Sequence, residues 1–265
     1  MASVDAETLK TAVRTTYGNI ASTDKASGCG GSVGCCGSAA RATSDAFGYS
    51  DEERRSAPDG SDLGLGCGNP QAIAELRSGE RVLDLGSGAG FDAFLAARQV
   101  GPTGSVIGVD MTSQMVAKAR GNVLKTDCRN VEFRLGEIER LPVADESVDV
   151  IMSNCVINLS TDKPAVFHEA FRVLAPGGRL AISDIVAVRD LPDAIRGDLE
   201  AYAGCVAGAV LASEVEGMIR GAGFEDVHVD LKQESRALAQ DWSPGVEDLV
   251  ASALIRATKP RVDQS

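Results

Sequence analysis

The feature that most constrains the fold is the stretch of residues 82–90, which reads Val-Leu-Asp-Leu-Gly-Ser-Gly-Ala-Gly. Its first four residues form an apolar run that predicts a fully buried strand. Gly86, Gly88 and Gly90 then permit a tight turn and let backbone N–H groups approach a ligand closely. A helical pattern over residues 91–99 follows directly. This order of strand, glycine turn and helix predicts an α/β fold with a ligand site at the turn.

The spacing of these glycines separates two adenosine cofactors. Dinucleotide-binding oxidoreductases carry G-x-G-x-x-G, whereas this chain has G-x-G-x-G, with Asp84 two residues before the first glycine. That spacing favours S-adenosylmethionine (AdoMet) over NAD, because AdoMet has no pyrophosphate to seat on the helix N-terminus. A second signal is Asp110, which ends the apolar run that starts at Ser105. A carboxylate at the tip of this second strand accepts hydrogen bonds from both ribose hydroxyls of an adenosine.

Strand and helix patterns alternate along the rest of the chain, which predicts a parallel sheet with helices on both faces. The predicted fold class is α/β, a Rossmann-like doubly wound methyltransferase sheet of seven strands. The expected strands cover residues 81–85, 105–109, 131–135, 148–153, 179–184, 226–231 and 251–258. The expected helices cover residues 5–17, 70–77, 91–99, 113–125, 162–174, 192–205 and 213–222.

The composition along the chain predicts three parts. Residues 1–66 are expected to form an N-terminal helix and a flexible arm, because residues 28–38 consist almost entirely of glycine, serine and cysteine. Residues 67–185 form the predicted AdoMet-binding core. Residues 186–265 form a small C-terminal addition on the substrate side, which completes the sheet.

Ligands of such sheets bind outside the carboxyl ends of the strands, so the residues that follow each strand are the candidates for the site. After the third strand, Glu137 and Ile138 offer an acidic and an apolar side chain for the adenine amino group and ring. For Glu137, an exposed loop carboxylate is the alternative. The residues predicted to bind AdoMet are Asp84, Gly86, Ser87, Gly88, Gly90, Asp110, Met111, Glu137, Ile138 and Asn154.

Charge and targeting signals limit the partners and the compartment. The net charge of −12 argues against nucleic acid as a partner, since phosphate binding needs a basic face. The sequence has no apolar run long enough for a transmembrane helix and no secretory signal at its start. We therefore expect a cytoplasmic protein that does not bind membranes.

Seven cysteines are unusual in such a compartment. Their odd number and reducing surroundings argue against a disulfide framework, and the two histidines lie far from any zinc-type pair of cysteines. Cys155 follows the fourth strand, and Cys205 follows the helix after the fifth. Cys67 stands at a glycine turn before the core, and we expect these three thiols to face one ligand. Cys128 is expected only to pack.

Several thiols beside a methyl donor predict a soft, thiophilic substrate. Trivalent arsenic is such a centre, because it binds two or three thiolates and keeps a lone pair. That lone pair can attack the methyl group of a sulfonium in line, so no general base is required. The enzyme would contribute orientation and the exclusion of water. The opposing interpretation is that the cysteines simply fill the core.

Several stretches carry a resemblance to a known family. The chain resembles the arsenite S-adenosylmethionine methyltransferases from about residue 14 to residue 231, and its glycine turn is shared by many methyltransferases. The segments Ser-Asn-Cys-Val-Ile-Asn-Leu at residues 153–159 and Gly-Cys-Val-Ala-Gly at residues 204–208 are more specific. Further matches are Tyr17-Gly18, Leu65-Gly-Cys-Gly-Asn-Pro70, Gly108-Val-Asp-Met111 and Gly136-Glu-Ile-Glu-Arg-Leu-Pro142.

The resemblance implies four working cysteines. Cys155 and Cys205 match the two that bind As(III) throughout, and Cys67 matches a third. The fourth belongs to the N-terminal arm, where Cys35 or Cys36 is favoured over Cys29. In the family, methylation oxidises arsenic, a cysteine disulfide returns it to the trivalent state, and thioredoxin or glutathione resets the enzyme.

Two alternatives stay open at this stage. One is an AdoMet-dependent methyltransferase of another small molecule, such as a quinone or sterol, in which the cysteines pack. The other is a thiol-rich protein that binds As(III) without turnover. One departure from the family is also visible, because Gly64-Leu65-Gly66 stands where animal and algal enzymes have aromatic residues.

Overall fold

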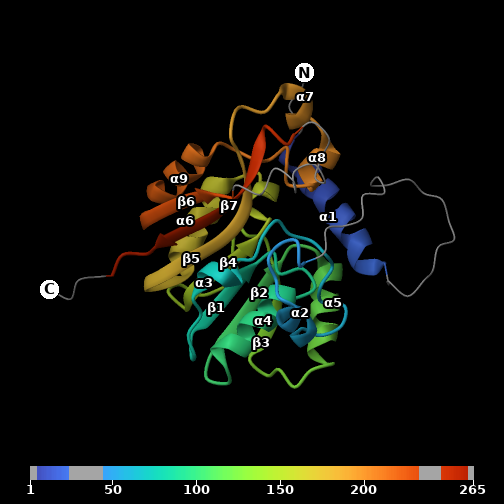
Figure 1. Ribbon diagram of the computed structural model, residues 1–265, viewed down its shortest axis with the longest axis vertical. Helices are drawn as coiled ribbons and strands as arrows, with labels where there is room; N and C mark the ends of the chain where they lie inside the picture. Colours follow the sequence, from blue (N-terminus) through green and yellow to red (C-terminus); the bar gives the residue numbers. More distant parts are fainter. Residues whose placement is uncertain (1–4, 24–43, 233–245, 262–265) are drawn as a thin grey trace.

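The protein is built on one seven-stranded sheet with the strand order β3-β2-β1-β4-β5-β7-β6, seen in a computed structural model that describes residues 5–23, 44–232 and 246–261 (Figure 1). The order reverses between β1 and β4, so the carboxyl ends of these two strands border a crevice where ligands bind in such folds. The strands are β1 (Arg81–Leu85), β2 (Ser105–Asp110), β3 (Val131–Leu135), β4 (Val148–Asn154), β5 (Leu174–Ala187), β6 (Glu225–Leu231) and β7 (Val250–Thr258).

The last strand corrects the prediction of an all-parallel sheet. β7 lies between β5 and β6 and pairs antiparallel with both, whereas β1 to β5 pair in parallel. The period of an apolar pattern reveals a strand but not its direction, and antiparallel neighbours need no crossover helix between them. The sheet is therefore mixed, with its single reversed strand on the β5 side.

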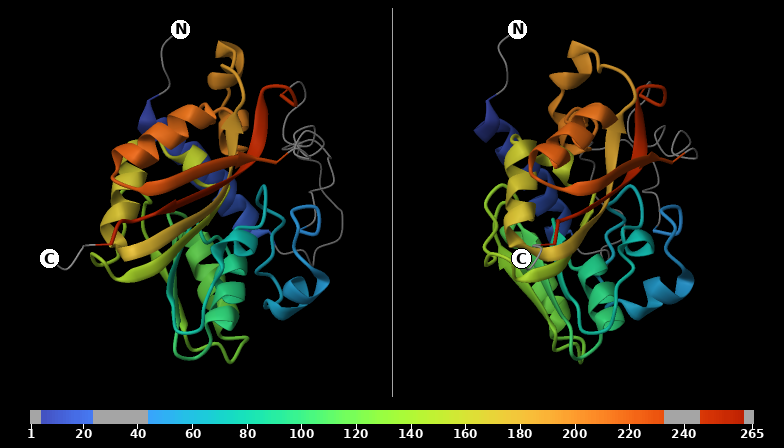
Figure 2. Two further views of the ribbon diagram at one scale, coloured as in Figure 1. Left: turned by 60° about the vertical axis from the view of Figure 1, so that its left-hand side comes forward. Right: turned by 90° about the vertical axis from the view of Figure 1, so that its left-hand side faces the viewer.

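Helices cover both faces of the sheet, as the alternating pattern predicted. On one face lie α3 (Gln71–Ala74), α4 (Phe91–Val100) and α5 (Ser113–Val123), and on the other lie α6 (Lys163–Val173) and α9 (Ala212–Gly221) (Figure 2). Successive side chains of β1 point to opposite faces of the sheet. Val82 packs in the apolar cluster with α4, and Leu83 packs in the apolar cluster with α6. Both side chains are fully buried.

One predicted helix is divided in two. Residues 192–205 form α7 (Asp193–Arg196) and α8 (Leu199–Ala203), followed by a turn that carries Cys205. Gly197 ends α7, and the Asp198 side chain accepts hydrogen bonds from the N–H groups at the start of α8, so the chain restarts a helix instead of continuing one. After this break, the Cys205 thiol is buried and reaches the Cys155 carbonyl.

A second helix forms within residues 1–66, where the sequence predicted a flexible arm after the N-terminal helix. Residues Asp51–Ser56 form α2, which begins with a capping box between Ser50 and Glu53. The predicted helix over residues 70–77 is shorter than expected, because α3 ends where Glu75 takes up a left-handed conformation. The predicted boundary after residue 185 falls within β5, which continues to Ala187.

The helix α1 (Ala6–Ser22) crosses the carboxyl end of the sheet between α5 and α8 (Figure 1). The Lys118 Nζ donates a hydrogen bond to the Ala21 carbonyl at 3.1 Å, and the Tyr17 hydroxyl donates one to the Ala203 carbonyl at 3.1 Å. Val13 of α1 belongs to a third apolar cluster that also contains Cys67 and Cys205. The helix therefore closes the crevice over the predicted thiol site.

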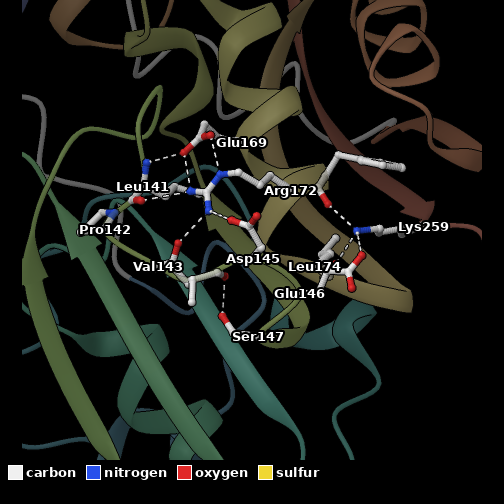
Figure 3. Close-up of polar contacts among 12 residues, drawn as sticks. Leu141, Pro142, Val143, Asp145, Glu146, Ser147, Glu169, Arg172, Leu174 and Lys259 are labelled. Carbon is white, nitrogen blue, oxygen red and sulfur yellow. Dashed lines mark hydrogen bonds and ion pairs between the residues drawn. The ribbon is translucent and has the colours of Figure 1, made fainter.

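A polar cluster fixes the opposite, amino end of the sheet (Figure 3). At the end of α6, the Arg172 guanidinium pairs with Glu169 and Asp145 and donates to the Leu141 and Val143 carbonyls. Lys259, which follows β7, donates to two carbonyl groups of α6 and β5, at Phe171 and Leu174. These contacts join α6 to the loop before β4 and to the end of β7. Within the described ranges, no helix is both long and apolar enough to cross a membrane.

Candidate active site

The glycine turn has the left-handed backbone conformation that only glycine adopts readily. Gly86, Gly88 and Gly90 have φ angles of 66°, 52° and 96°, which side-chain-bearing residues rarely adopt. A Cβ atom on Gly86 would lie 2.3 Å from the Val156 side chain, and one on Gly90 would lie 2.6 Å from the Phe133 ring. The turn therefore packs directly beneath the residue that follows Cys155.

Two acceptors near this turn lack a partner. The Asp84 Oδ2 and the Ser87 Oγ are buried, and no hydrogen bond reaches them from the described residues. Burial raises the pKa of Asp84 well above its usual range, and the neighbouring carboxyl groups of Asp92 and Asp110 raise it further. A buried polar group without a partner is costly. These residues therefore fit a ligand that brings a cationic donor, such as the ammonium group of AdoMet.

Asp110 is held in place by two backbone donors. Its carboxylate accepts hydrogen bonds from the Gly88 N–H at 2.9 Å and the Thr112 N–H at 2.8 Å. Burial raises the pKa of this group, and these two bonds oppose the rise. Each carboxylate oxygen has a second acceptor position, so both remain able to accept from ribose hydroxyls. Met111 is half-buried and packs against the cluster that holds the thiols.

The loop after β3 is used in a way the sequence did not suggest. The Glu137 carboxylate pairs with the Lys10 Nζ at 2.7 Å and with an Arg14 guanidinium nitrogen at 2.5 Å, both from α1. The Lys10 contact is the main reason that the pKa of Glu137 is lowered. Ile138 is buried in the core cluster of α6. A contact of this pair with adenine stays a prediction, and the contact seen is an anchor for α1.

Three cysteines lie together at the carboxyl end of β4 and β5, and their binding of one ligand stays a prediction. The Sγ atoms of Cys67 and Cys155 and a carboxylate oxygen of Asp184 all lie within 4.8 Å of one another. The Cys205 thiol donates a hydrogen bond to the Cys155 carbonyl at 2.9 Å, and the Cys155 thiol contacts both other thiols. All three cysteines are free.

The surroundings of Cys67 and Cys155 raise the pKa of both thiols. The pKa of Cys155 lies well above the usual range because of its contacts with Cys205 and Cys67, and burial raises it further. Burial is the main reason that the pKa of Cys67 is raised. Tyr17 is partly buried against the same cluster, and its pKa is raised well above the usual range by burial first and by Cys205 and Cys155 next. From the sequence, Tyr17 is named only as part of a family motif.

Asn154 was predicted to bind the cofactor, but its amide groups hold the Cys67 turn. The Asn154 Oδ1 accepts from the Cys67 N–H at 3.1 Å, and the Nδ2 donates to the Gly68 carbonyl at 2.8 Å. The same Nδ2 reaches the Tyr49 hydroxyl at 3.1 Å and an Asp92 carboxylate oxygen at 3.3 Å. On the other side, the Ser252 hydroxyl of β7 donates to the Cys67 carbonyl at 2.9 Å.

The other cysteines do not join this group in the described part of the chain. Cys128 lies at the amino end of the sheet, where its thiol contacts the Asn130 side chain at 3.2 Å, so it packs as expected. Cys29, Cys35 and Cys36 fall outside the described residues.

Comparisons with known proteins identify the family. A family model described as a methyltransferase domain matches residues 76–235. An arsenite methyltransferase of Halobacterium salinarum is 49% identical over 98% of this chain and 68% of its own length. The human arsenite methyltransferase is 38% identical over 60% of this chain, but the match covers only 44% of the human protein.

A solved structure completes the comparison. The crystal structure of CrArsM, described as an arsenic(III) S-adenosylmethionine methyltransferase of Chlamydomonas reinhardtii, superimposes with a TM-score of 0.63. It is 35% identical, and the match covers 82% of this chain and 73% of that one. The fold and the matched domain thus define an AdoMet-dependent methyltransferase. Within that class, the chain belongs to the arsenite methyltransferase family.

Proposed function

We propose that this chain transfers methyl groups from AdoMet to trivalent arsenic held by Cys67, Cys155 and Cys205, and so detoxifies arsenite. The observation that carries the proposal is the meeting of these three thiols beside the glycine turn. The two sites touch, because the side chain of Val156, next to Cys155, occupies the space left by the missing Cβ of Gly86.

The thiols bind the substrate by exchange. Arsenous acid carries three hydroxyl groups, and each thiol that attacks forms one As–S bond, breaks one As–O bond and sends its proton out with the hydroxyl as water. Protonated thiols therefore suffice, which matches the raised pKa values of Cys67 and Cys155. Thiolate ligands also select soft centres over the hard cations of the cell.

The residues of the glycine turn hold the methyl donor. Asp84 and Ser87 offer buried acceptors to its amino acid end, and Asp110 offers two oxygens to its ribose. When bound, AdoMet supplies the electrophilic methyl carbon that the arsenic lone pair attacks, as the C–S bond breaks and leaves its electron pair on sulfur. The contribution of the protein is orientation and the exclusion of water, for which the buried position of Cys67 and Cys205 is suited.

Each methyl transfer oxidises arsenic from the trivalent to the pentavalent state, so a second methylation needs two electrons. We propose that a pair of cysteines supplies them by forming a disulfide, with Cys35 or Cys36 as one partner. A thiol reductant such as thioredoxin or glutathione then restores the dithiol. This cycle requires a reducing compartment, which is the basis for placing the protein in the cytoplasm.

The test is turnover by the purified chain with AdoMet, arsenite and excess thiol, read by chromatography of methylated arsenicals, with Cys155→Ser in parallel. Methylated arsenic from the wild type and none from the variant is the expected result. Binding of arsenite without methylation would instead indicate a sequestering protein. If arsenite neither binds nor reacts, the cysteines pack, and a carbon, nitrogen or oxygen acceptor such as a quinone becomes the substrate to seek.

A further inference from the structure

The two cysteines that face each other share an unusual backbone conformation. Cys155 and Cys205 have φ angles of 59° and 66°, in the left-handed region that disfavours residues with a side chain. Glycine, which would relieve the strain, carries no thiol. Such conformations persist only where the surroundings fix them, so the structure must contain groups that hold both turns.

The first of these groups is Asp184, at the end of β5. Its Oδ2 accepts hydrogen bonds from the N–H groups of Val156 and Ile157 at 3.2 and 2.8 Å, the two residues after Cys155. The Asp184 Oδ1 accepts a hydrogen bond from the N–H group of the next residue, Ile185, at 2.8 Å. The backbone N–H of Cys155 itself bonds to the Ser183 carbonyl at 2.8 Å. The turn of Cys155 is thus tied to β5 on both sides.

The second group is Asn158, which joins this turn to the turn of Cys205. Its side chain is almost fully buried at 3% exposure. The Nδ2 donates to Asp184 Oδ1 at 3.1 Å, to the Ile185 carbonyl at 2.5 Å and to the Cys205 carbonyl at 3.2 Å. The two backbones are also in direct contact, because a Cβ on Gly208 would lie 2.0 Å from the Asn158 carbonyl oxygen.

We propose that Asn158, anchored by Asp184, is a positioning residue that sets Cys155 and Cys205 as one two-thiol receptor before the substrate arrives. The inference rests on the proposed function and names the residues that prepare its site. A receptor with two fixed thiols loses little conformational freedom when both bind one arsenic atom, which strengthens binding. Neither Asn158 nor Asp184 has to touch the reacting atoms for this effect.

The test uses phenylarsine oxide, which as its hydrate exchanges two hydroxyl groups for two thiols and releases two waters. Asn158→Ala removes the link, and we expect the Kd for this probe and the KM for arsenite to rise about 10- to 100-fold. The affinity for AdoMet and the alkylation of Cys155 by N-ethylmaleimide, which needs one thiol, are expected not to fall. A merely structural role would raise the Kd for AdoMet together with the two arsenic constants.

Asn130→Ala is the matched control. The Asn130 amide also donates to two backbone carbonyls, at Ala97 and Gly101, but lies at the other end of the sheet, so phenylarsine oxide should bind as in the wild type. If Asn158→Ala does not fold, Asn158→Ser retains one donor and should give a smaller rise in the same two constants.

The outcomes separate the two proposals. Unchanged capture of phenylarsine oxide by the Asn158 variants, with methylation by the wild type intact, would overturn the inference alone. Capture by the wild type that is weakened in the variants, without any methylation of arsenite, would support the receptor and overturn the proposed function.

Discussion

The two halves of the crevice are built in opposite ways. The cofactor half comes from one contiguous unit, β1 to β2 through α4, and no residue in the described part of the chain bonds to its buried Asp84 Oδ2 and Ser87 Oγ. The thiol half brings together three distant turns, and the amide and carboxylate groups around them are used within the protein.

The difference follows from what each ligand brings. AdoMet carries its own donors and acceptors, so open polar groups on the protein are matched when it binds. An arsenic atom offers only As–S bonds, so it cannot satisfy a backbone N–H or carbonyl, and the protein must do so itself. Substitutions that affect only one half test this division.

The largest effect is expected from the thiols. Cys155→Ser and Cys205→Ser replace a soft ligand by a hydroxyl of similar shape, so turnover of both arsenite and monomethylarsenite should fall to background. Calorimetry should still detect AdoMet binding in both variants. Loss of AdoMet binding would show that the two halves are not separate. Cys128→Ser, at the far end of the sheet, should match the wild type in both assays.

Gly86→Ala comes next, because it strains both halves at once. The φ of 66° and the 2.3 Å approach to Val156 predict a loss of about 2–4 kcal/mol in unfolding free energy and weaker binding of AdoMet and of phenylarsine oxide. Gly217→Ala is the control, because its added Cβ meets nothing within 4 Å in α9. That variant should be more stable by about 0.5–1 kcal/mol. Equal stability of the two variants would contradict the strain argument.

Asn154→Ala decides to which half this residue belongs. The hydrogen bonds to Cys67 and Gly68 predict a KM for arsenite about 10-fold higher, with a Kd for AdoMet close to that of the wild type. Steady-state kinetics and calorimetry measure the two constants. A rise in the AdoMet Kd alone would restore the cofactor role that the sequence predicted.

The pH dependence of stability tests Asp92, whose carboxylate accepts a hydrogen bond from Asn154. Burial raises the pKa of Asp92 from 3.8 to about 6. The folded state therefore binds this proton more tightly than the unfolded chain. The stability that the protonated Asp92 contributes is present below pH 4 and is lost as the pH rises to about 6. The slope of this loss is at most about 1.4 kcal/mol per pH unit. In Asp92→Asn this slope should be smaller. Urea unfolding at several pH values without ligand measures it, and parallel curves for both proteins would count against the prediction.

The smallest effect is expected at the ion pairs that fasten α1. Lys10→Gln removes the 2.7 Å contact with Glu137, which is partly exposed, so the loss in unfolding free energy should be about 0.5–1 kcal/mol and should shrink in high salt. Capture of phenylarsine oxide should not change. A large loss of capture would show that the ion pair of Lys10 also holds the thiols in place.

The same division explains what the sequence could predict. The turn from Asp84 to Gly90 is readable because its residues are contiguous and each glycine has a local backbone reason. Cys155 is readable because the carboxyl end of a parallel strand faces the crevice. Pattern and position therefore found the sheet and its layers, and they placed the cysteine site, which stays a prediction, at the carboxyl ends of the strands.

Other features depend on contacts between residues far apart in the chain, which a local sequence pattern does not predict. Asn154 stands in the predicted place, yet its amide bonds to Cys67, a residue 87 positions earlier in the chain. The apolar face of α1 predicts burial but not the loop onto which Lys10 and Arg14 would fold. The direction of β7 is set by the neighbours it pairs with, and a strand has the same period in either direction.

The place of β7 in the sheet has a consequence for biosynthesis. A ribosome makes the chain from its N-terminus, so β1 to β6 emerge first while the strand that separates β5 from β6 is still missing. Only when residues 250–258 emerge can β5 gain its second neighbour and Ser252 reach the carbonyl of Cys67. The turn that carries Cys67 thus gains its hydrogen bond from β7 only after translation has passed the last strand, whereas the groups that hold Cys155 and Cys205 are made before it.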